Sequence, residues 1–214
     1  MMSIIYLGKN MEELSPALVV LLFLEDFARE NPSIRKGAKY FQWQKRYDGY
    51  DVAYSIVGAT LAELVHEGYI ELESKKKLFR KSIIFTRKRL IPKKYGVLGR
   101  GLNSISEYTP TALHSALFLV FPVSRFPAAF LGTYIIEKEL KDEEPEKLRS
   151  DPEVVKYKEK LKALLEEFKE GNPELWDGIK KEVDKACQLV RGKQGYTLYS
   201  PLDMLEERKN ESKN

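Results

Sequence analysis

Hydrophobic positions along the first third of the chain follow helical spacing. The run Ala17–Leu24 is apolar on every side, which predicts a helix in the centre of a core. Ser15-Pro16 is a typical helix start, and Asn31-Pro32 predicts that the helix ends at about Glu30. Because the apolar run is too short to span a bilayer and has acidic flanks, it does not indicate a targeting signal.

The pattern then changes from helix to strand. We expect a second helix at Asp51–His66, with Asp51 as its cap and Gly68 as its stop. The residues Tyr69–Glu73 alternate as a strand does, Ser74–Lys77 predict a turn, and Leu78–Leu90 predict a second strand. Two helices followed by a basic hairpin are the order of elements in a winged helix.

The second half of the chain begins with its least polar stretch, Thr111–Ile136. Arg125 and two prolines interrupt this stretch, so a simple transmembrane helix is not expected. Two amphipathic helices follow, starting at Asp151-Pro152 and Asn172-Pro173. Their apolar faces carry Val154, Tyr157, Leu161, Leu164, Leu165 and Phe168 in the first, and Trp176, Ile179, Val183, Ala186 and Val190 in the second.

These elements predict a mainly α protein with a small β-hairpin. A winged-helix-like portion, residues 1–100, would be followed by an apolar segment and a helical portion, residues 101–214, packed on the first. Composition agrees with a folded protein, because 43% of the 214 residues are apolar and 11% are aromatic. The single cysteine excludes a disulfide framework. The density of Lys and Glu is typical of proteins from hot environments.

Charge is strongly segregated along the chain. The whole sequence has a net charge of +4. Residues 71–100 contain eleven basic residues against Glu71 and Glu73, a net charge of +9, whereas residues 1–70 have −2 and residues 137–214 have −3. The protein is therefore mildly acidic apart from one basic segment, and that segment is where we expect a partner to bind.

No motif for catalysis is present in the sequence. There is no phosphate-binding loop, no dinucleotide-binding glycine pattern, no nucleophile elbow and no zinc-protease motif. His66 and His114 lie 48 positions apart, and we interpret both as structural or surface residues, and Cys187 as a small core residue. We therefore expect a protein that is not an enzyme and that uses no metal or cofactor.

The basic hairpin is the strongest electrostatic feature. A cluster of this kind can neutralise phosphates, either on nucleic acid or on anionic lipid headgroups. The alternative is a solvated edge hairpin, whose lysines prevent edge-to-edge aggregation. We favour phosphate binding, and the candidate anion-binding residues are Lys75, Lys76, Lys77, Arg80, Lys81, Arg87, Lys88, Arg89, Lys93 and Lys94.

The composition of the second helix bears on whether the phosphates belong to DNA or to lipid headgroups. A helix that reads bases in the major groove needs Arg, Lys, Asn or Gln on its exposed face. The stretch Val52–Val65 contains none of these four residue types, which is typical of a packed core helix. Contact of the hairpin with the DNA backbone stays open, but sequence-specific reading of DNA is disfavoured.

Three segments resemble one known family. The stretch Tyr54–Leu64 with Gly68–Leu72, the hairpin residues Arg80–Ser82 with Thr86–Lys88, and the stretch Phe121–Ala129 are similar, in this order, to segments of the Golgi phosphoprotein family. The resemblance implies a peripheral membrane protein that binds phosphatidylinositol 4-phosphate. The family's lipid site uses an arginine in the signature helix and a preceding tryptophan. Val57 or a neighbour takes the arginine's place here and Trp43 is only roughly placed, so no ligand residue is carried over.

Three hypotheses follow from the sequence. The first is a non-enzymatic binding protein, cytoplasmic and peripheral on the membrane, whose hairpin contacts an anionic phospholipid surface. The second is a winged-helix DNA-binding protein of the transcription-regulator type, with the hairpin as the wing. The third is a protein-interaction scaffold. The apolar segment and the C-terminal helices are candidate surfaces for a homodimer.

Overall fold

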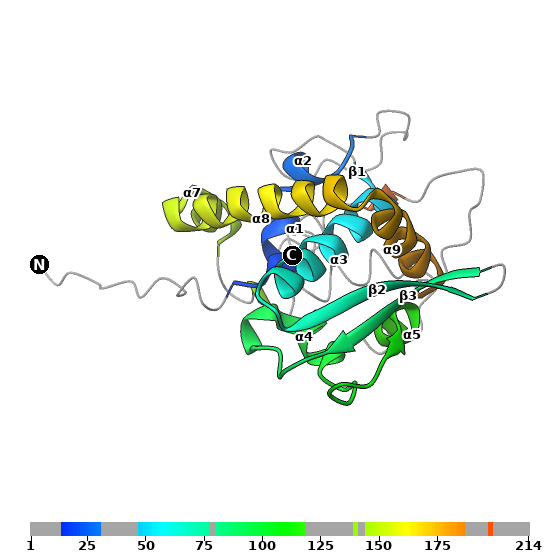
Figure 1. The fold of residues 1–214 in the computed structure, drawn as a ribbon. Helices are drawn as coiled ribbons and strands as arrows, with labels where there is room; N and C mark the ends of the chain where they lie inside the picture. The colour runs from blue at the N-terminus through cyan, green and yellow to red at the C-terminus, as the bar shows by residue number, and fades with distance from the viewer. Residues whose placement is uncertain are drawn as a thin grey trace, which may run out of the picture.

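A computed structural model describes residues 14–30, 47–77, 80–118, 139–140, 144–186 and 197–198. The described residues are mostly helical, with one small antiparallel sheet, which confirms the predicted fold class at this level. Figure 1 shows α8 crossing α1 and α3, with the hairpin of β2 and β3 beside this helical layer.

The first helix starts where the sequence predicts and ends earlier. In α1 (Pro16–Leu22), the Ser15 side chain caps the helix by accepting a hydrogen bond from the Leu18 backbone N–H. The predicted continuation to Glu30 is wrong: the backbone breaks at Phe23, and a short helix, α2 (Leu24–Phe27), follows. Because the helix breaks there, the Leu22 carbonyl accepts a hydrogen bond from Arg149 Nη1 at 2.5 Å instead of one from the next helical turn.

The second predicted helix is the centre of the core. It runs as α3 (Gly49–His66) and packs against α1, α8 and α9. The prediction of Asp51 as its cap is wrong, because the helix begins two residues earlier and Asp51 lies in its first turn. Its stop is as predicted, because Gly68 adopts a φ of +70°, a conformation that glycine permits. The buried residues of α3 include Val52, Ala53, Ile56, Val57, Ala59, Leu61 and Leu64.

The first hairpin strand is longer than the predicted Tyr69–Glu73, whereas the second lies within the predicted Leu78–Leu90 and is shorter. β2 (Ile70–Lys77) pairs antiparallel with β3 (Arg80–Arg87), and β4 (Thr111–Ala112) pairs with the middle of β3. The predicted turn at Ser74–Lys77 is therefore wrong. Lysine has a low strand propensity, but a complete ladder of cross-strand pairs overrides it.

The segment after the hairpin folds back onto the sheet. A 3₁₀ turn, η2 (Lys93–Tyr95), leads into α4 (Gly96–Leu102), and β4 leads into α5 (Leu113–Phe118). Within the apolar stretch that begins at Thr111, the side chains of Leu113, Ala116 and Leu117 are buried in the core. Residues 119–136 of that stretch lie outside the described part of the chain.

The C-terminal helices start at the predicted residues. After the short α7 (Pro145–Ser150), α8 (Pro152–Gly171) is capped by Asp151, and α9 (Pro173–Ala186) follows Asn172. Helix α8 packs on α1 and α3, whereas α9 packs on β3. The second contact is close, because a Cβ added at Gly178 would lie 2.5 Å from Ile83 Cδ1.

A second, two-stranded sheet joins β1 (Tyr47–Asp48) and β5 (Thr197–Leu198). Tyr47 is buried, with 3% of its surface exposed. Burial, followed by the nearby Glu25 and Glu30, raises the pKa of Tyr47 to about 12. Among the described helices, none is both long enough and apolar enough to cross a bilayer.

Candidate functional site: the hairpin of β2 and β3

The register of the hairpin places basic residues opposite one another. At its outer end Lys76 pairs with Lys81, and Lys77 pairs with Arg80. We call these four residues the hairpin tip. Like charges on directly opposite positions of an antiparallel pair destabilise it. The sequence from residue 74 to residue 84 contains no Asp or Glu, so the strand positions next to the tip carry only basic and uncharged residues.

Acidic residues of β2 neutralise the basic residues further along the strands. Lys88 forms an ion pair with Glu71, and Lys75 Nζ lies 3.4 Å from Glu73 Oε2. The hydrogen bond to Glu71 holds the pKa of Lys88 above its ordinary value. Both pairs are exposed to solvent, but they still balance the charge of the two lysines locally.

Two arginines near the hairpin's inner end have structural partners. Arg87 is 8% exposed, and its Nε donates a hydrogen bond of 2.8 Å to the Ile105 carbonyl. The Arg89 guanidinium lies 4.2 Å from the centroid of the Tyr69 ring and donates to the Glu67 carbonyl. We call Arg87, Lys88 and Arg89, together with Glu71 and Glu73, the hairpin base.

The last two candidate lysines lie in η2. Lys94 Nζ is 5.0 Å from the Tyr95 ring centroid and 3.9 Å from Glu63 Oε1, so it faces the helical layer. Lys93 is exposed, and no ion pair reaches it within the described part of the chain. Of these two residues, only Lys93 offers its charge directly to an external anion.

A buried carboxylate holds η2 against the helices. Glu63 of α3 is fully buried, and its Oε2 accepts a hydrogen bond of 2.8 Å from the Tyr157 hydroxyl. Burial, with the Glu63 charge nearby, raises the pKa of both Tyr157 and Tyr95. Lys160 Nζ approaches Glu63 Oε1 at 3.4 Å. Lys94 belongs to this cluster, and its contact with Glu63 links the segment after the hairpin to α3. Its role there is structural.

The ten candidate residues therefore fall into separate environments. At the hairpin base Lys88 is paired with Glu71, Arg87 is buried, and Arg89 is exposed with the Tyr69 ring and the Glu67 carbonyl as partners. Lys94 faces an acidic group of the core, and Lys75 has one exposed acidic neighbour. At the hairpin tip the strand register sets basic residues opposite one another, in a stretch of sequence without Asp or Glu. Figure 1 shows the outer ends of β2 and β3 extending past α9 to the edge of the molecule.

Helix α3 is not available to a DNA groove. Its residues from Val52 to Leu64 are almost all buried, and α1, α8 and α9 pack around it. A recognition helix needs an exposed face that reaches the bases. The burial of α3 therefore disfavours the hypothesis of a DNA-binding protein that reads bases with this helix.

The two histidines have different surroundings. His66 is exposed at the end of α3, whereas His114 Nδ1 lies 2.5 Å from Glu182 Oε2, a carboxylate that is 1% exposed. Burial alone would raise the pKa of Glu182, but hydrogen bonds from Lys185 and His114 outweigh it and hold the pKa below its ordinary value. Within the described residues, no three His, Cys, Asp or Glu side chains gather as metal ligands would. Cys187 lies outside the described residues.

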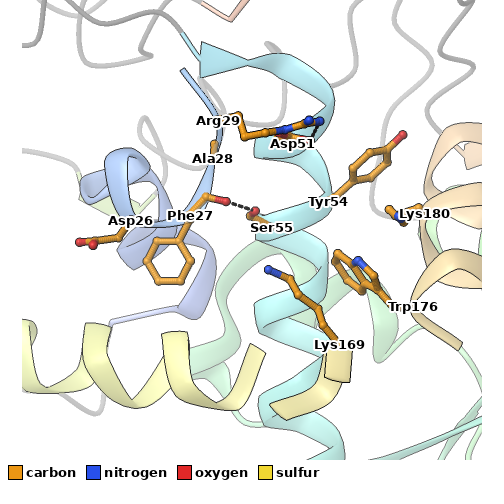
Figure 2. Close-up of a pocket in the computed structure, with 10 residues that line it drawn as sticks. All are labelled: Asp26, Phe27, Ala28, Arg29, Asp51, Tyr54, Ser55, Lys169, Trp176 and Lys180. Carbon is orange, nitrogen blue, oxygen red and sulfur yellow. Dashed lines mark hydrogen bonds and ion pairs between the residues drawn. The ribbon is translucent and has the colours of Figure 1, made fainter. Parts of the chain in front are cut away.

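A cavity that the sequence did not predict lies on the side of α9 away from the hairpin. It has a volume of about 430 Å³ and lies between α2, α3, α8 and α9 (Figure 2). The pattern of the sequence gave Trp176 only as part of the apolar face of a helix. Nothing in that pattern places Trp176 beside Tyr54 and Lys169, because the three residues come from three helices. The remaining lining residues are Asp26, Phe27, Ala28, Arg29, Asp51, Ser55 and Lys180.

Comparisons with protein-family models, with curated proteins and with solved structures give no match for this chain.

Proposed function

We propose that the protein is a non-enzymatic binding protein that contacts the phosphate groups of an anionic membrane surface through the hairpin tip. The observation that carries this proposal is the register, which sets Lys76 opposite Lys81 and Lys77 opposite Arg80. Such an arrangement costs stability in the free protein. A phosphate-rich surface offsets that cost, because it supplies the negative charge that the strands lack.

The magnitude of the attraction is sufficient for reversible binding. A Lys or Arg near an anionic leaflet contributes about 1 kcal/mol, so the four tip residues together contribute about 4 kcal/mol. The attraction falls off within a Debye length, about 8 Å at physiological salt. We therefore expect weak, salt-sensitive binding that places the protein on the membrane peripherally.

Two observations favour a membrane over DNA. Helix α3 is buried and has no Arg, Lys, Asn or Gln between Val52 and Val65, so it lacks the residues and the exposure for reading bases. The resemblance of three segments to the Golgi phosphoprotein family supports a lipid partner. In the DNA alternative, α1, α3 and the hairpin form a winged-helix-like unit, and the hairpin contacts the DNA backbone as a wing.

The scaffold alternative rests on the position of β2. It is one of the two edge strands of the described sheet, and lysines on an edge strand prevent pairing with other molecules. In that case the hairpin tip serves solubility only, and its charge has no partner.

The decisive experiment compares two variants with the same change in net charge. The tip variant replaces the three lysines and one arginine of the hairpin tip with serine. The control variant replaces three exposed lysines and one exposed arginine elsewhere with serine: Arg100, Lys147, Lys156 and Lys181. Both are tested by sedimentation with liposomes of phosphatidylcholine alone or with added phosphatidylserine, and by a salt titration of duplex DNA binding.

We expect wild type and the control variant to sediment with phosphatidylserine liposomes and not with neutral ones. The tip variant should bind roughly a thousandfold more weakly, as the loss of about 4 kcal/mol implies. Tight duplex binding without recovery on liposomes would establish the DNA alternative. Equal behaviour of the tip and control variants in both assays would overturn the role of the hairpin tip and leave the scaffold alternative.

A further inference from the structure

The cavity on the side of α9 away from the hairpin has the size of a small-molecule site. Its volume of about 430 Å³ lies within the range of ligand pockets in proteins, roughly 300–1,000 Å³. Both aromatic and charged side chains line it. The aromatic residues are Phe27, Tyr54 and Trp176, and the charged ones are Asp26, Asp51, Arg29, Lys169 and Lys180. Figure 2 shows Phe27, Lys169 and Trp176 around one space, with Asp26 pointing away from it.

The acidic residues of the cavity are already occupied by cations of the protein. Asp26 accepts hydrogen bonds from Lys158 at 2.9 Å and from Lys162 at 3.2 Å. Burial by itself would raise the pKa of Asp26, but these hydrogen bonds outweigh it and lower the pKa. Asp51 is held by two hydrogen bonds from the Arg29 guanidinium, of 2.5 and 3.1 Å. A cationic ligand would have to displace these partners.

The carboxylate partners of the cavity's two lysines are more exposed than Asp26 and Asp51. Lys169 pairs with Glu166 at 2.8 Å and Lys180 pairs with Asp177 at 2.7 Å, each three residues along its own helix. The Glu166 side chain is 52% exposed and that of Asp177 is 63% exposed. Exposed pairs of this spacing contribute little, so an anion in the cavity can take over either lysine at small cost.

A fixed aromatic surface lies next to these lysines. Lys169 Nζ and Lys180 Nζ are 5.6 and 5.9 Å from the centroid of the Trp176 ring. The ring is held in place by α3, because a Cβ added at Gly58 would lie 2.6 Å from Trp176 Cζ3. In Figure 2 the Lys169 side chain extends into the space between Phe27 and Trp176. Positive charge and a flat apolar surface therefore adjoin in one cavity.

From these contacts we infer that the cavity binds a small organic anion with an aromatic part. The anionic group, a phosphate or a carboxylate, pairs with Lys169 and Lys180, and the aromatic ring packs against Trp176. Neither half of such a ligand suffices alone. A small anion without a ring gains only the exchange of one exposed ion pair for another, and a neutral ring gains no contact with the two lysines.

This site is separate from the hairpin tip. Helix α9 touches the hairpin at Gly178, which faces Ile83, while Trp176 and Lys180 of the same helix line the cavity. The inference does not depend on membrane binding, and each site has residues that the other does not use. The two can therefore be tested independently.

The test is isothermal titration calorimetry of the full chain with matched probes. 1-Naphthyl phosphate and 1-naphthoate carry both an aromatic part and an anionic group, 1-naphthol carries only the ring, and inorganic phosphate carries only the charge. We expect saturable binding of one or both aromatic anions with a dissociation constant below about 1 mM, and at least tenfold weaker binding of 1-naphthol and of inorganic phosphate. The aromatic anion that binds more tightly identifies the preferred anionic group.

Variants assign the binding to the cavity. The double variant Lys169→Gln and Lys180→Gln should weaken binding of the aromatic anion at least tenfold, and Lys169→Arg with Lys180→Arg should retain it. The matched control, Lys156→Gln with Lys181→Gln, changes one exposed lysine on each of the same two helices and should bind as wild type does. Circular dichroism checks that each variant is folded.

Three results would overturn the inference. The first is that neither aromatic anion binds wild type saturably. The second is that the double glutamine variant binds the aromatic anion as tightly as wild type. The third is that the tip variant loses this binding and the double glutamine variant keeps it. The tip variant should bind the naphthyl probe normally while it loses liposome binding. The double glutamine variant should show the reverse, so that failure of one proposal is distinguishable from failure of the other.

Discussion

The two ends of the hairpin use the same residue types in opposite ways. At the hairpin base, Lys88 is paired with Glu71, and Arg87 is buried with its Nε on the Ile105 carbonyl. At the hairpin tip, the register sets Lys76 opposite Lys81, and residues 74–84 of the sequence contain no Asp or Glu. Lys88 and Arg87 are therefore engaged within the fold, whereas the register of the tip sets basic residues opposite one another.

A count of charges along the sequence therefore does not identify which basic residues have partners within the protein. The segment from residue 71 to residue 100 has a net charge of +9, yet Arg87, Lys88 and Lys94 all have partners within the protein. Which charges are satisfied depends on the strand register and on tertiary contacts. Three predictions test this contrast between the two ends.

The largest expected effect is on the stability of the hairpin base. Arg87→Met retains an apolar stem of similar length but removes the donor to the Ile105 carbonyl. Because a charged donor is lost from a buried hydrogen bond, we expect the free energy of unfolding to fall by about 2–3 kcal/mol, measured by urea denaturation. Arg89→Met, at an exposed position, should cost less than about 1 kcal/mol. Liposome binding of both folded variants should be unchanged, and a large loss would contradict the structural role of Arg87.

A gain of binding is expected when the hairpin base is made to resemble the tip. The double variant Glu71→Ser and Glu73→Ser releases Lys88 and Lys75 from their acidic partners. If each released lysine contributes about 1 kcal/mol at an anionic surface, binding should strengthen up to about thirtyfold. Sedimentation with phosphatidylserine liposomes measures the change. The control is Glu167→Ser with Glu170→Ser, two exposed positions on α8, which changes the net charge equally; an equal gain there would mean that only the overall charge matters.

The smallest expected effect is a gain in stability at the hairpin tip. Lys81→Glu places a carboxylate opposite Lys76 and replaces a like-charge pair with an opposite-charge pair. We expect the free energy of unfolding to rise by about 0.5–1 kcal/mol, and the gain should shrink in high salt. Binding to anionic liposomes should weaken in the same variant. A variant that gains stability and keeps full binding would separate the tip's charge from its proposed function.

Local signals in the sequence predicted much of the fold correctly. Ser15-Pro16, Asp151-Pro152 and Asn172-Pro173 each mark a helix start in the structure, and Gly68 marks a helix end. The cap of α8 shows why: the Asp151 side chain accepts a hydrogen bond from the Glu153 backbone two residues away. Signals of this kind need only neighbouring residues, so they are readable without the tertiary structure.

The errors occur where distant residues decide the backbone. The break at Phe23 leaves the Leu22 carbonyl to Arg149, a residue 127 positions away. The extension of β2 to Lys77 depends on pairing with β3, which outweighs the low strand propensity of lysine. The candidate site was predicted as one basic cluster, and the structure divides it by register and burial, neither of which a charge count contains.

By itself, the sequence determined the starts of α1, α8 and α9, the existence of a basic hairpin and the apolar character of α3, because these depend on residue type and short spacing. Only the tertiary structure decided which basic residues are neutralised, which face of the molecule holds the cavity, and that Trp176 stands beside Lys169 and Lys180. The physical reason is that ion pairs, burial and cavities arise between elements far apart in the chain. Their energies depend on distance in space, which spacing along the sequence does not specify.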